Sequence, residues 1–411
     1  MTDRSPAPAR PCILQVIPRL DTGGAEQTTI DMVEAIVKAG GRALVATEGG
    51  RLEPRIGELG GEVVHLPVGS KSPATILINA RRLSGLAQRE GVNLIHVRSR
   101  APAWSCLIAA RRLKLPLVTT YHGAYAGTSP VKTWYNGVMA RGDVVIANSR
   151  FTAQLIEQRH RTPADRLVVV HRGVDLRRFD PAVVSAERGA ALRRAWGVAS
   201  GRPVILNAAR LTGWKGQMVV VEAAIELFRA GRLGDAVVVL VGDAQGRDGY
   251  VEQLRSRIAS AGLTDRVVLA GHCADMPAAF REACVSVVAS TEPEAFGRVA
   301  AEAMAMGCPV IATDIGAPPE ILAAGSEKVG WLVRPNDPHT LAEAIAAVLA
   351  MPLDECRSLA QRARRQVAQH FSLLAMQRAT LAVYDRLLGT RLADRLIPPN
   401  GAPEAMSLAR D

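Results

Sequence analysis

The stretch PVILNAARLTGWKGQMVVVEAAIELFRAGRLGDAVVVLVGD, residues 203–243, decides the fold because it contains a complete strand–helix–strand unit. The apolar runs at 203–211 and 237–243 are typical of strands that are buried on both faces of a parallel sheet. Between them, a loop leads into a helix that begins near Gly216. The stretch therefore predicts one βαβ unit of an α/β domain.

The same alternation of short apolar runs and helical patterns continues in both directions along the 411-residue chain. Two series of such runs predict an α/β fold with two doubly wound, Rossmann-like domains, each built on a parallel sheet. The other runs that we expect to form strands are 12–17, 43–47, 63–67, 94–97, 117–122, 144–148 and 167–171 in the first half, and 267–271, 285–290, 309–314 and 330–333 in the second.

The length of the chain also suggests two domains, at about 100–200 residues for each. We place the boundary between them near 195–202, because prolines and glycines interrupt the apolar pattern around it. The expected parts are an N-terminal arm (1–11), a first domain (12–197), a second domain (198–371), a C-terminal helix (372–389) and a flexible tail (390–411).

The net charge of +11 comes entirely from the first half of the chain. Up to Ala195 there are 28 basic and 16 acidic residues, and from Trp196 onward there are 22 and 23. One interpretation is a set of solvated arginine-rich faces. The other is a surface for an anionic acceptor or an anionic membrane, centred on 81–114 with Trp104, Trp134 and Tyr135 as interfacial aromatics. Nucleic acid is not an expected partner, because the aromatic side chains that would stack on bases are scarce.

The six cysteines lie far apart and form no CxxC pair, so neither a disulfide framework nor a zinc site is predicted. No run approaches the roughly 18 apolar residues that a membrane-spanning helix needs. The apolar run at 12–17 is also too short for a signal peptide. We expect a cytoplasmic protein, with peripheral binding to the cytoplasmic face of the inner membrane as a further hypothesis.

Two motifs at strand ends are suited to phosphate groups. Gly23 and Gly24, in PRLDTGGAE, open a helix at the end of the first strand, where backbone N–H groups favour an anion. Arg210 and Lys215, in AARLTGWKGQ, follow the strand at 203–209. Ligands of open α/β sheets bind at that edge, so both cations are candidates for holding a diphosphate.

The segment STEPEAFGRVAAEAMAMGCPVIATDIGAPPEI, residues 290–321, carries a pair of glutamates. Glu294 lies in a loop, and Glu302 lies in the helix that we expect to start near Phe296. Backbone N–H groups at the start of this helix would face an anion. An acid in the helix flank at Glu302, among alanines and methionines, is difficult to explain as a simple surface residue. The residues that would supply these N–H groups are Phe296, Gly297 and Arg298.

In this order along the chain, these motifs resemble glycosyltransferase family 4, a group of retaining nucleotide-sugar transferases with two facing Rossmann-like domains, the GT-B architecture. The resemblance covers residues 12–388. The C-terminal helix is expected to cross back to the first domain. Smaller matches are TYHG with His122, Asn148-Ser149, RGVD at 172–175, VGD at 241–243, GAPPEI at 316–321 and GWLV at 330–333.

The resemblance implies a role for each motif residue. Glu294 would orient the donor sugar, and Glu302 would bind the ribose hydroxyls. Arg210 and Lys215 would neutralise the donor diphosphate, with help from the amides of Phe296, Gly297 and Arg298. From the first domain, the resemblance implies that Gly23 and Gly24 approach the phosphates and that His122 lies close to the sugar and acceptor.

The predicted reaction is retaining transfer of a hexose from a nucleoside-diphosphate sugar to a glycoconjugate acceptor. A UDP-sugar is the favoured donor, and GDP-mannose is the alternative. The resemblance implies that the acceptor of this chain is an envelope glycoconjugate: lipopolysaccharide core, a lipid-linked oligosaccharide or an exopolysaccharide. We expect no metal and no cofactor, since the chain has no DxD motif and fixed cations can stabilise the leaving group. An NAD-dependent Rossmann oxidoreductase is the alternative from another class, although the GxGxxG fingerprint is missing.

Overall fold

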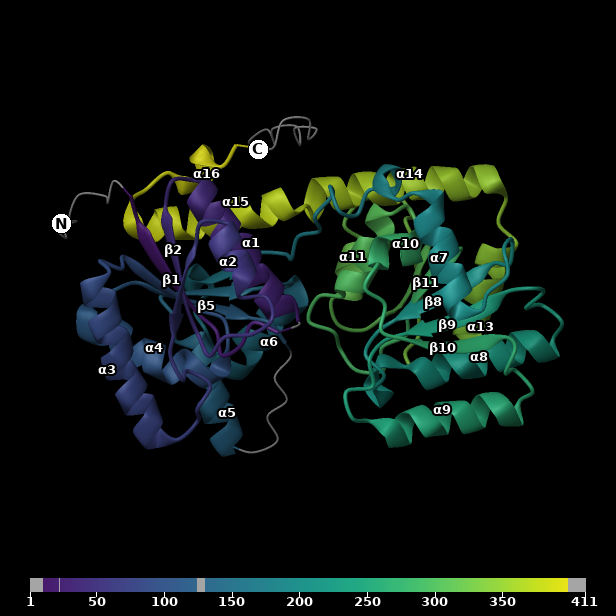
Figure 1. Ribbon diagram of the computed structural model, residues 1–411, viewed down its shortest axis with the longest axis horizontal. Helices are drawn as coiled ribbons and strands as arrows, with labels where there is room; N and C mark the ends of the chain where they lie inside the picture. The colour runs from purple at the N-terminus through teal and green to yellow at the C-terminus, as the bar shows by residue number, and fades with distance from the viewer. Residues whose placement is uncertain (1–9, 22, 124–129, 398–411) are drawn as a thin grey trace. The chain divides into compact units, whose positions relative to one another are not determined.

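The computed structural model describes residues 10–21, 23–123 and 130–397 (Figure 1). The chain forms two compact units. Unit 1 contains the chain up to Gly173 together with the residues from Leu373 onward, and unit 2 is Val174–Ser372. The chain therefore passes between the units twice. Of the predicted terminal segments, residues 1–9 of the arm and 398–411 of the tail lie outside the described residues.

Unit 1 is built on a seven-stranded parallel sheet with the strand order β3-β2-β1-β4-β5-β6-β7. Alternate residues of β1 enter different apolar clusters: Leu14 packs into one and Ile13 into the other. This burial on both faces explains why the strands are continuous apolar runs in the sequence. The strands are β1 (Cys12–Val16), β2 (Arg42–Thr47), β3 (Glu62–His65), β4 (Leu94–Val97), β5 (Leu117–Tyr121), β6 (Val144–Ala147) and β7 (Leu167–Val169).

A helix follows each of β1–β6 along the chain, as in a doubly wound domain. Helices α3 and α4 pack against each other. Two short 3₁₀ turns, η1 (Gly137–Ala140) and η2 (Ala164–Arg166), precede β6 and β7. The helices of unit 1 are α1 (Gly24–Lys38), α2 (Pro54–Glu58), α3 (Pro73–Arg89), α4 (Arg100–Leu113), α5 (Pro130–Asn136), α6 (Arg150–His160), α15 (Leu373–Leu388) and α16 (Leu392–Arg395).

Unit 2 repeats the architecture with a six-stranded parallel sheet in the order β10-β9-β8-β11-β12-β13. Along β8, Leu206 packs into one apolar cluster and Ile205 into the other, so this sheet is also covered on both faces. The strands are β8 (Val204–Ala208), β9 (Val237–Val241), β10 (Val267–Gly271), β11 (Val285–Val288), β12 (Val310–Thr313) and β13 (Trp331–Val333).

The helices of unit 2 follow its strands as the sequence pattern predicts, and both units have the expected Rossmann-like fold. The stretch 203–243 forms β8, α8 and β9. The helical elements are η3 (Pro181–Val183), α7 (Ala186–Trp196), η4 (Gly213–Lys215), α8 (Gln217–Arg229), α9 (Asp248–Ser260), α10 (Met276–Glu282), α11 (Arg298–Ala305), α12 (Pro318–Leu322), α13 (Pro338–Leu349) and α14 (Leu353–His370).

The division after Gly173 falls 24 residues before the expected boundary at 197/198. The reason is α7, which packs against α10 and buries Trp196 in the core of unit 2. The Arg188 guanidinium lies 2.7 Å from the Asp275 carboxylate and ties the two helices together. The glycines and prolines near 197–203 therefore mark the turn between α7 and β8.

The C-terminal helix α15 belongs to unit 1, where it packs against α1. Its Tyr384 is completely buried, and the Tyr384 hydroxyl lies 2.6 Å from His96 Nδ1. The expected tail begins differently from the prediction, because residues 392–395 form α16. Leu392 and Leu396 enter the apolar core, which explains why this part of the chain is ordered against unit 1.

The excess charge follows the structural units even more closely than the two halves of the sequence. Unit 1 carries 28 basic and 17 acidic residues, and unit 2 carries 22 of each. Among the helices that the structure describes, none is long and apolar enough to cross a membrane. The positive charge is thus a property of unit 1 and its surface.

Candidate functional site

In unit 2, Lys215 and Glu294 meet at the carboxyl edge of the sheet. Lys215 ends η4 in the loop after β8, and Glu294 lies in the loop after the neighbouring strand β11. Lys215 Nζ is 2.7 Å from Glu294 Oε1, and the two side chains are only 15% and 11% exposed. The Ser290 hydroxyl donates to the same carboxylate oxygen. A partly desolvated ion pair thus stands at the edge where ligands of open α/β sheets bind.

Gly216 allows the loops after β8 and β11 to approach each other. Its φ is +72°, and a Cβ on it would lie 1.8 Å from the carbonyl oxygen of Ala289. The backbone N–H of Thr291 donates to the Trp214 carbonyl at 2.8 Å and holds the same two loops together. Gly216 of the WKGQ motif is therefore needed to bring the loop that carries Lys215 close to the loop after β11. Lys215 Nζ also lies 4.4 Å from the Trp214 ring centroid.

Arg210 lies on the same loop as Lys215 but in a different environment. Its side chain is exposed, and no carboxylate within the described residues forms a salt bridge with it. Its carbonyl oxygen accepts a hydrogen bond from Gln217 Nε2 at 2.9 Å, which anchors the loop to the start of α8. Arg210 thus carries an exposed guanidinium on an anchored loop backbone, open to a ligand, whereas Lys215 already has an internal partner.

The second glutamate, Glu302, pairs with an arginine of its own helix. α11 starts at Arg298, two residues later than expected, so Glu302 lies one turn inside it. Arg298 Nη2 is 2.9 Å from Glu302 Oε1. The Glu302 side chain is 11% exposed, which excludes a freely solvated surface acid.

The segment before α11 is held by a buried ring and by a glycine. Phe296 is buried and packs edge-on against Phe371, with ring centroids 5.9 Å apart. Gly297 caps the helix with φ +92°, a conformation that favours glycine. The loop carrying Glu294 is also tied down, because the Ala317 N–H donates to the Glu294 carbonyl at 2.9 Å. These contacts give the predicted amides at 296–298 a defined backbone.

In unit 1, Gly23 and Gly24 open α1 as expected. Gly23 is the cap residue and Gly24 the first helical residue. A Cβ on Gly24 would lie 2.3 Å from Arg172 Nη1, so glycine leaves room for the Arg172 guanidinium at the start of the helix. Arg172 is 7% exposed. It also donates to the Thr28 hydroxyl at 3.4 Å.

His122 follows β5 and receives a hydrogen bond from Arg172. Arg172 Nη2 is 2.7 Å from His122 Nδ1. Because Nδ1 accepts from a guanidinium, the imidazole proton is carried by Nε2. Burial, Arg172 and Arg98 hold the pKa of His122 well below its usual range, which makes the ring neutral. Its Nε2 is buried without a hydrogen-bond partner in the described part of the chain.

In unit 2 the structure pairs Lys215 with Glu294 and, separately, Arg298 with Glu302. In unit 1 it brings Gly24 and His122 together through Arg172. Arg172 has no predicted role in the sequence analysis, although RGVD at 172–175 is one of the family matches. The feature that marks Arg172 is its position after β7 as a buried arginine. Ser290, in the motif STEPEAF, was also missed as a partner of Glu294.

Comparison with known protein families matches each half of the chain to a glycosyltransferase family model. The glycosyltransferase family 4 model matches residues 22–178, and the model of glycosyl transferases group 1 matches residues 190–366. A lipopolysaccharide core biosynthesis mannosyltransferase of Rhizobium meliloti is 30% identical over 67% of this chain and 74% of its own length.

Solved structures extend the likeness over nearly the whole chain. A glycosyltransferase from Rickettsia africae is 32% identical, with a TM-score of 0.86 over 93% of this chain and all of that one. The Anabaena protein HepE, solved in complex with UDP-glucose, is 25% identical, with a TM-score of 0.77 over 92% of this chain and all of that one.

Proposed function

The chain belongs to glycosyltransferase family 4, and on that premise we propose that it transfers a hexose from a nucleoside-diphosphate sugar to a glycoconjugate acceptor, with retention at the anomeric carbon. The observation that carries the proposal is the placement of Lys215 and Glu294, 2.7 Å apart, at the carboxyl edge of the unit 2 sheet. Family membership also removes the NAD-dependent oxidoreductase alternative.

The two cations of the 210–215 loop have complementary parts in this proposal. Arg210 is exposed and offers a guanidinium that can bind two phosphate oxygens at once. Lys215 has three N–H donors and uses one on Glu294, so it can hold the carboxylate and a phosphate oxygen together. Glu294 is then fixed by Lys215 and Ser290 while it accepts a hydrogen bond from a sugar hydroxyl.

The reaction breaks the bond between the anomeric carbon and the diphosphate oxygen and forms a bond from that carbon to the acceptor oxygen. The electron pair of the broken bond stays on the nucleoside diphosphate, where Arg210 and Lys215 stabilise the negative charge. The acceptor proton passes to the leaving phosphate oxygen on the same face. Neutral His122, whose Nε2–H has no internal partner in the described residues, would donate a hydrogen bond to a substrate oxygen.

The two glutamates have separable roles in this scheme. Glu302 would accept from the ribose hydroxyls, with Arg298 holding its carboxylate. Glu302→Ala should therefore weaken nucleoside diphosphate binding by about 10-fold, as expected for loss of hydrogen bonds to a charged group. Glu294→Ala should leave that affinity nearly unchanged and lower turnover. Calorimetric titration with UDP or GDP measures both, and equal losses of affinity would contradict the division.

We also propose that the reaction needs no metal ion or cofactor, because the diphosphate charge is met by Arg210 and Lys215 and by the amides at 296–298. EDTA should leave the initial rate unchanged. A rate that falls on chelation and returns with Mg²⁺ or Mn²⁺ would show that this part is wrong.

The acceptor is proposed to be an anionic or lipid-linked saccharide of the bacterial envelope, met at the cytoplasmic face of the inner membrane. Unit 1, which carries the whole charge excess, has exposed apolar side chains on α3, α4 and α5. Among the three predicted interfacial aromatics, Trp134 is 59% exposed, whereas Trp104 and Tyr135 are partly covered. On these three helices the large exposed apolar side chains among the described residues are Leu77, Ile78, Ile108 and Trp134.

Release of nucleoside diphosphate from a panel of donors tests the function. UDP-glucose and UDP-galactose are the favoured donors, and GDP-mannose is the second candidate, because the Rhizobium meliloti relative is a mannosyltransferase. Lys215→Met is the matched inactive variant, and Arg55→Gln, a charge change at an exposed position of α2 outside 81–114, is the control that should retain activity. The proposal would be refuted if none of these nucleotide sugars released nucleoside diphosphate when lipopolysaccharide core or lipid-linked oligosaccharide was offered as acceptor.

A further inference from the structure

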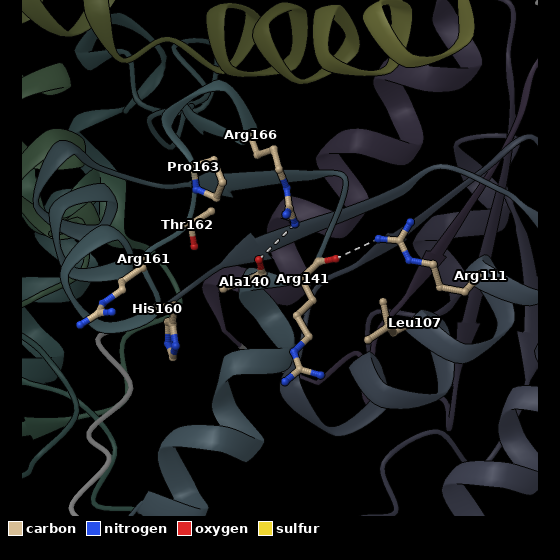
Figure 2. Close-up of a pocket in the computed structure, with 9 residues that line it drawn as sticks. All are labelled: Leu107, Arg111, Ala140, Arg141, His160, Arg161, Thr162, Pro163 and Arg166. Atoms are coloured by element: carbon tan, nitrogen blue, oxygen red, sulfur yellow. Dashed lines mark hydrogen bonds between the residues drawn. The ribbon is translucent and has the colours of Figure 1, made fainter. Parts of the chain in front are cut away.

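A pocket of about 470 Å³ opens on unit 1, and none of the residues assigned above to donor binding or transfer lines it. In Figure 2 the segment 160–163 lies on one side and Leu107 and Arg111 on the other, with Arg166, Ala140 and Arg141 between them. The polar side chains that line the pocket are Arg111, Arg141, His160, Arg161, Thr162 and Arg166.

The pocket lies at the amino edge of the unit 1 sheet. Arg111 is near the end of α4, just before β5, while Arg141 precedes β6 and Arg166 precedes β7. His122, by contrast, follows the carboxyl end of β5. Because strands of a parallel sheet all point the same way, the pocket and His122 lie at opposite edges. The proposed transfer reaction therefore gives this pocket no role.

The lining is strongly positive. It contains four arginines and no acidic residue. Arg111 is partly neutralised by Asp143, whose carboxylate lies 2.8 Å from its Nη1. Arg166 donates to the backbone carbonyls of Ala140 and Gly142, which carry no net charge. It forms no ion pair with a carboxylate among the described residues. Arg161 is exposed and likewise forms no ion pair with any residue that the structure describes.

Two buried polar atoms in the lining lack partners, which is the second and independent observation. Thr162 is 5% exposed, and its hydroxyl has no hydrogen-bond partner among the described residues. Arg166 Nε is also buried and has no hydrogen-bond partner among the described residues. Buried donors without partners are costly, at about 1–3 kcal/mol each, and they indicate a missing ligand or water. Here both are donors in a pocket of positive charge.

We propose that this pocket binds a phosphate group, as a phosphate monoester or diester. A phosphate carries several acceptor oxygens, so it can receive N–H donors from Arg161 and Arg166 and the O–H donor of Thr162 at once. Guanidinium groups match this geometry, because each can present two parallel N–H donors to two phosphate oxygens.

The phosphate has two sources with the same chemistry, a lipid headgroup and a soluble phosphate ester. Arg141 connects the pocket to an exposed aromatic surface, since its guanidinium carbon is 5.0 Å from the Trp104 ring centroid and 5.8 Å from that of Trp134. The two rings stack at 4.7 Å. A lipid phosphate in the pocket would place this aromatic pair at the membrane interface.

The test measures binding of glycerol 3-phosphate to the full chain by calorimetry, and binding of vesicles that contain phosphatidylglycerol in phosphatidylcholine. Thr162→Val removes only the unpartnered hydroxyl and keeps the side-chain shape. Arg161→Gln removes one lining charge. Arg55→Gln is the control, because Arg55 is an exposed arginine of unit 1 on α2 that neither lines the pocket nor lies in the basic stretch 81–114.

We expect saturable phosphate binding in at least one arm, weakened about 3- to 10-fold by Thr162→Val and about 10-fold by Arg161→Gln, with little change in Arg55→Gln. Dependence on Thr162 with glycerol 3-phosphate identifies a soluble ester, and the same dependence only with vesicles identifies a lipid. Binding that all three variants weaken equally, or that Thr162→Val leaves unchanged in both arms, would overturn the proposal. Thermal unfolding of each variant verifies that the fold is retained.

Discussion

Lys215→Met should destabilise unit 2 as well as abolish transfer, because Lys215 has a structural partner. Removing its ammonium leaves the Glu294 carboxylate, 11% exposed, with the Ser290 hydroxyl as its remaining side-chain donor in the described structure. Methionine has a similar length and is apolar, so the contact with the Trp214 ring is largely preserved. The change therefore isolates the loss of the charged hydrogen bond.

The size of the effect follows from the burial of the pair. Both partners are less than one-fifth exposed, so solvent screens the 2.7 Å contact less than a surface salt bridge. A hydrogen bond to a charged group contributes about 1.5–3 kcal/mol. We expect Lys215→Met to lower the free energy of unfolding by about 2 kcal/mol, which corresponds to a Tm lower by about 4–8 °C for a unit of this size.

Calorimetry and urea unfolding of the full chain, with single and double variants, measure the interaction directly. Glu294→Gln in the Lys215→Met background removes the unpaired charge, so the double variant should be more stable than the two single losses predict. A coupling energy of about 1–2 kcal/mol is expected. Arg210→Met, on the same loop but exposed, is the control and should change stability by less than about 0.5 kcal/mol. Additive single losses would refute the reasoning.

Three further predictions concern residues whose contacts are equally specific. Gly216→Ala should lower the unfolding free energy by about 3 kcal/mol or more in urea titrations, because its Cβ would lie 1.8 Å from the Ala289 carbonyl; a loss under 1 kcal/mol contradicts this. Tyr384→Phe removes the 2.6 Å partner of buried His96 Nδ1 and leaves it the longer 3.4 Å contact with Arg98 Nη2, which should cost about 1–3 kcal/mol, measured as a shift in Tm. Burial, Arg172 and Arg98 lower the pKa of His122 in the folded chain, so the unfolded chain binds a proton at His122 more readily than the folded chain. The free energy of unfolding should therefore fall as pH drops below about 6.5, by up to about 1.4 kcal/mol per pH unit. This slope should be smaller in His122→Gln.

Hydrophobic patterning was sufficient to locate the strands, since each apolar run that we expected corresponds to one of β1–β13. Parallel strands covered on both faces are continuous apolar runs, and such a signal is local in the sequence. The division between the units could not be read in this way. Local breaks near 197 resemble a linker, yet Trp196 and α7 are bound to unit 2 by contacts with residues about 90 positions away.

The residues of the candidate site were predictable as motifs, but their partners were not. Glu294 and Lys215 are 79 residues apart in the chain, and His122 and Arg172 are 50 apart. Whether such residues meet depends on which strands are neighbours. Here β11 lies beside β8, and the loops that follow these two strands consequently share one edge of the sheet.

The two parallel α/β units, the residues at strand ends and the family that the ordered motifs resemble could all be predicted from the sequence. These properties depend on periodicity and residue type over short distances. The tertiary structure was needed to show that Lys215 is paired and Arg210 is open, that Arg172 contacts both Gly24 and His122, and that a pocket of arginines forms at the amino edge of unit 1. The physical reason is that such contacts join residues from loops at a shared sheet edge, and strand order and helix packing bring them together.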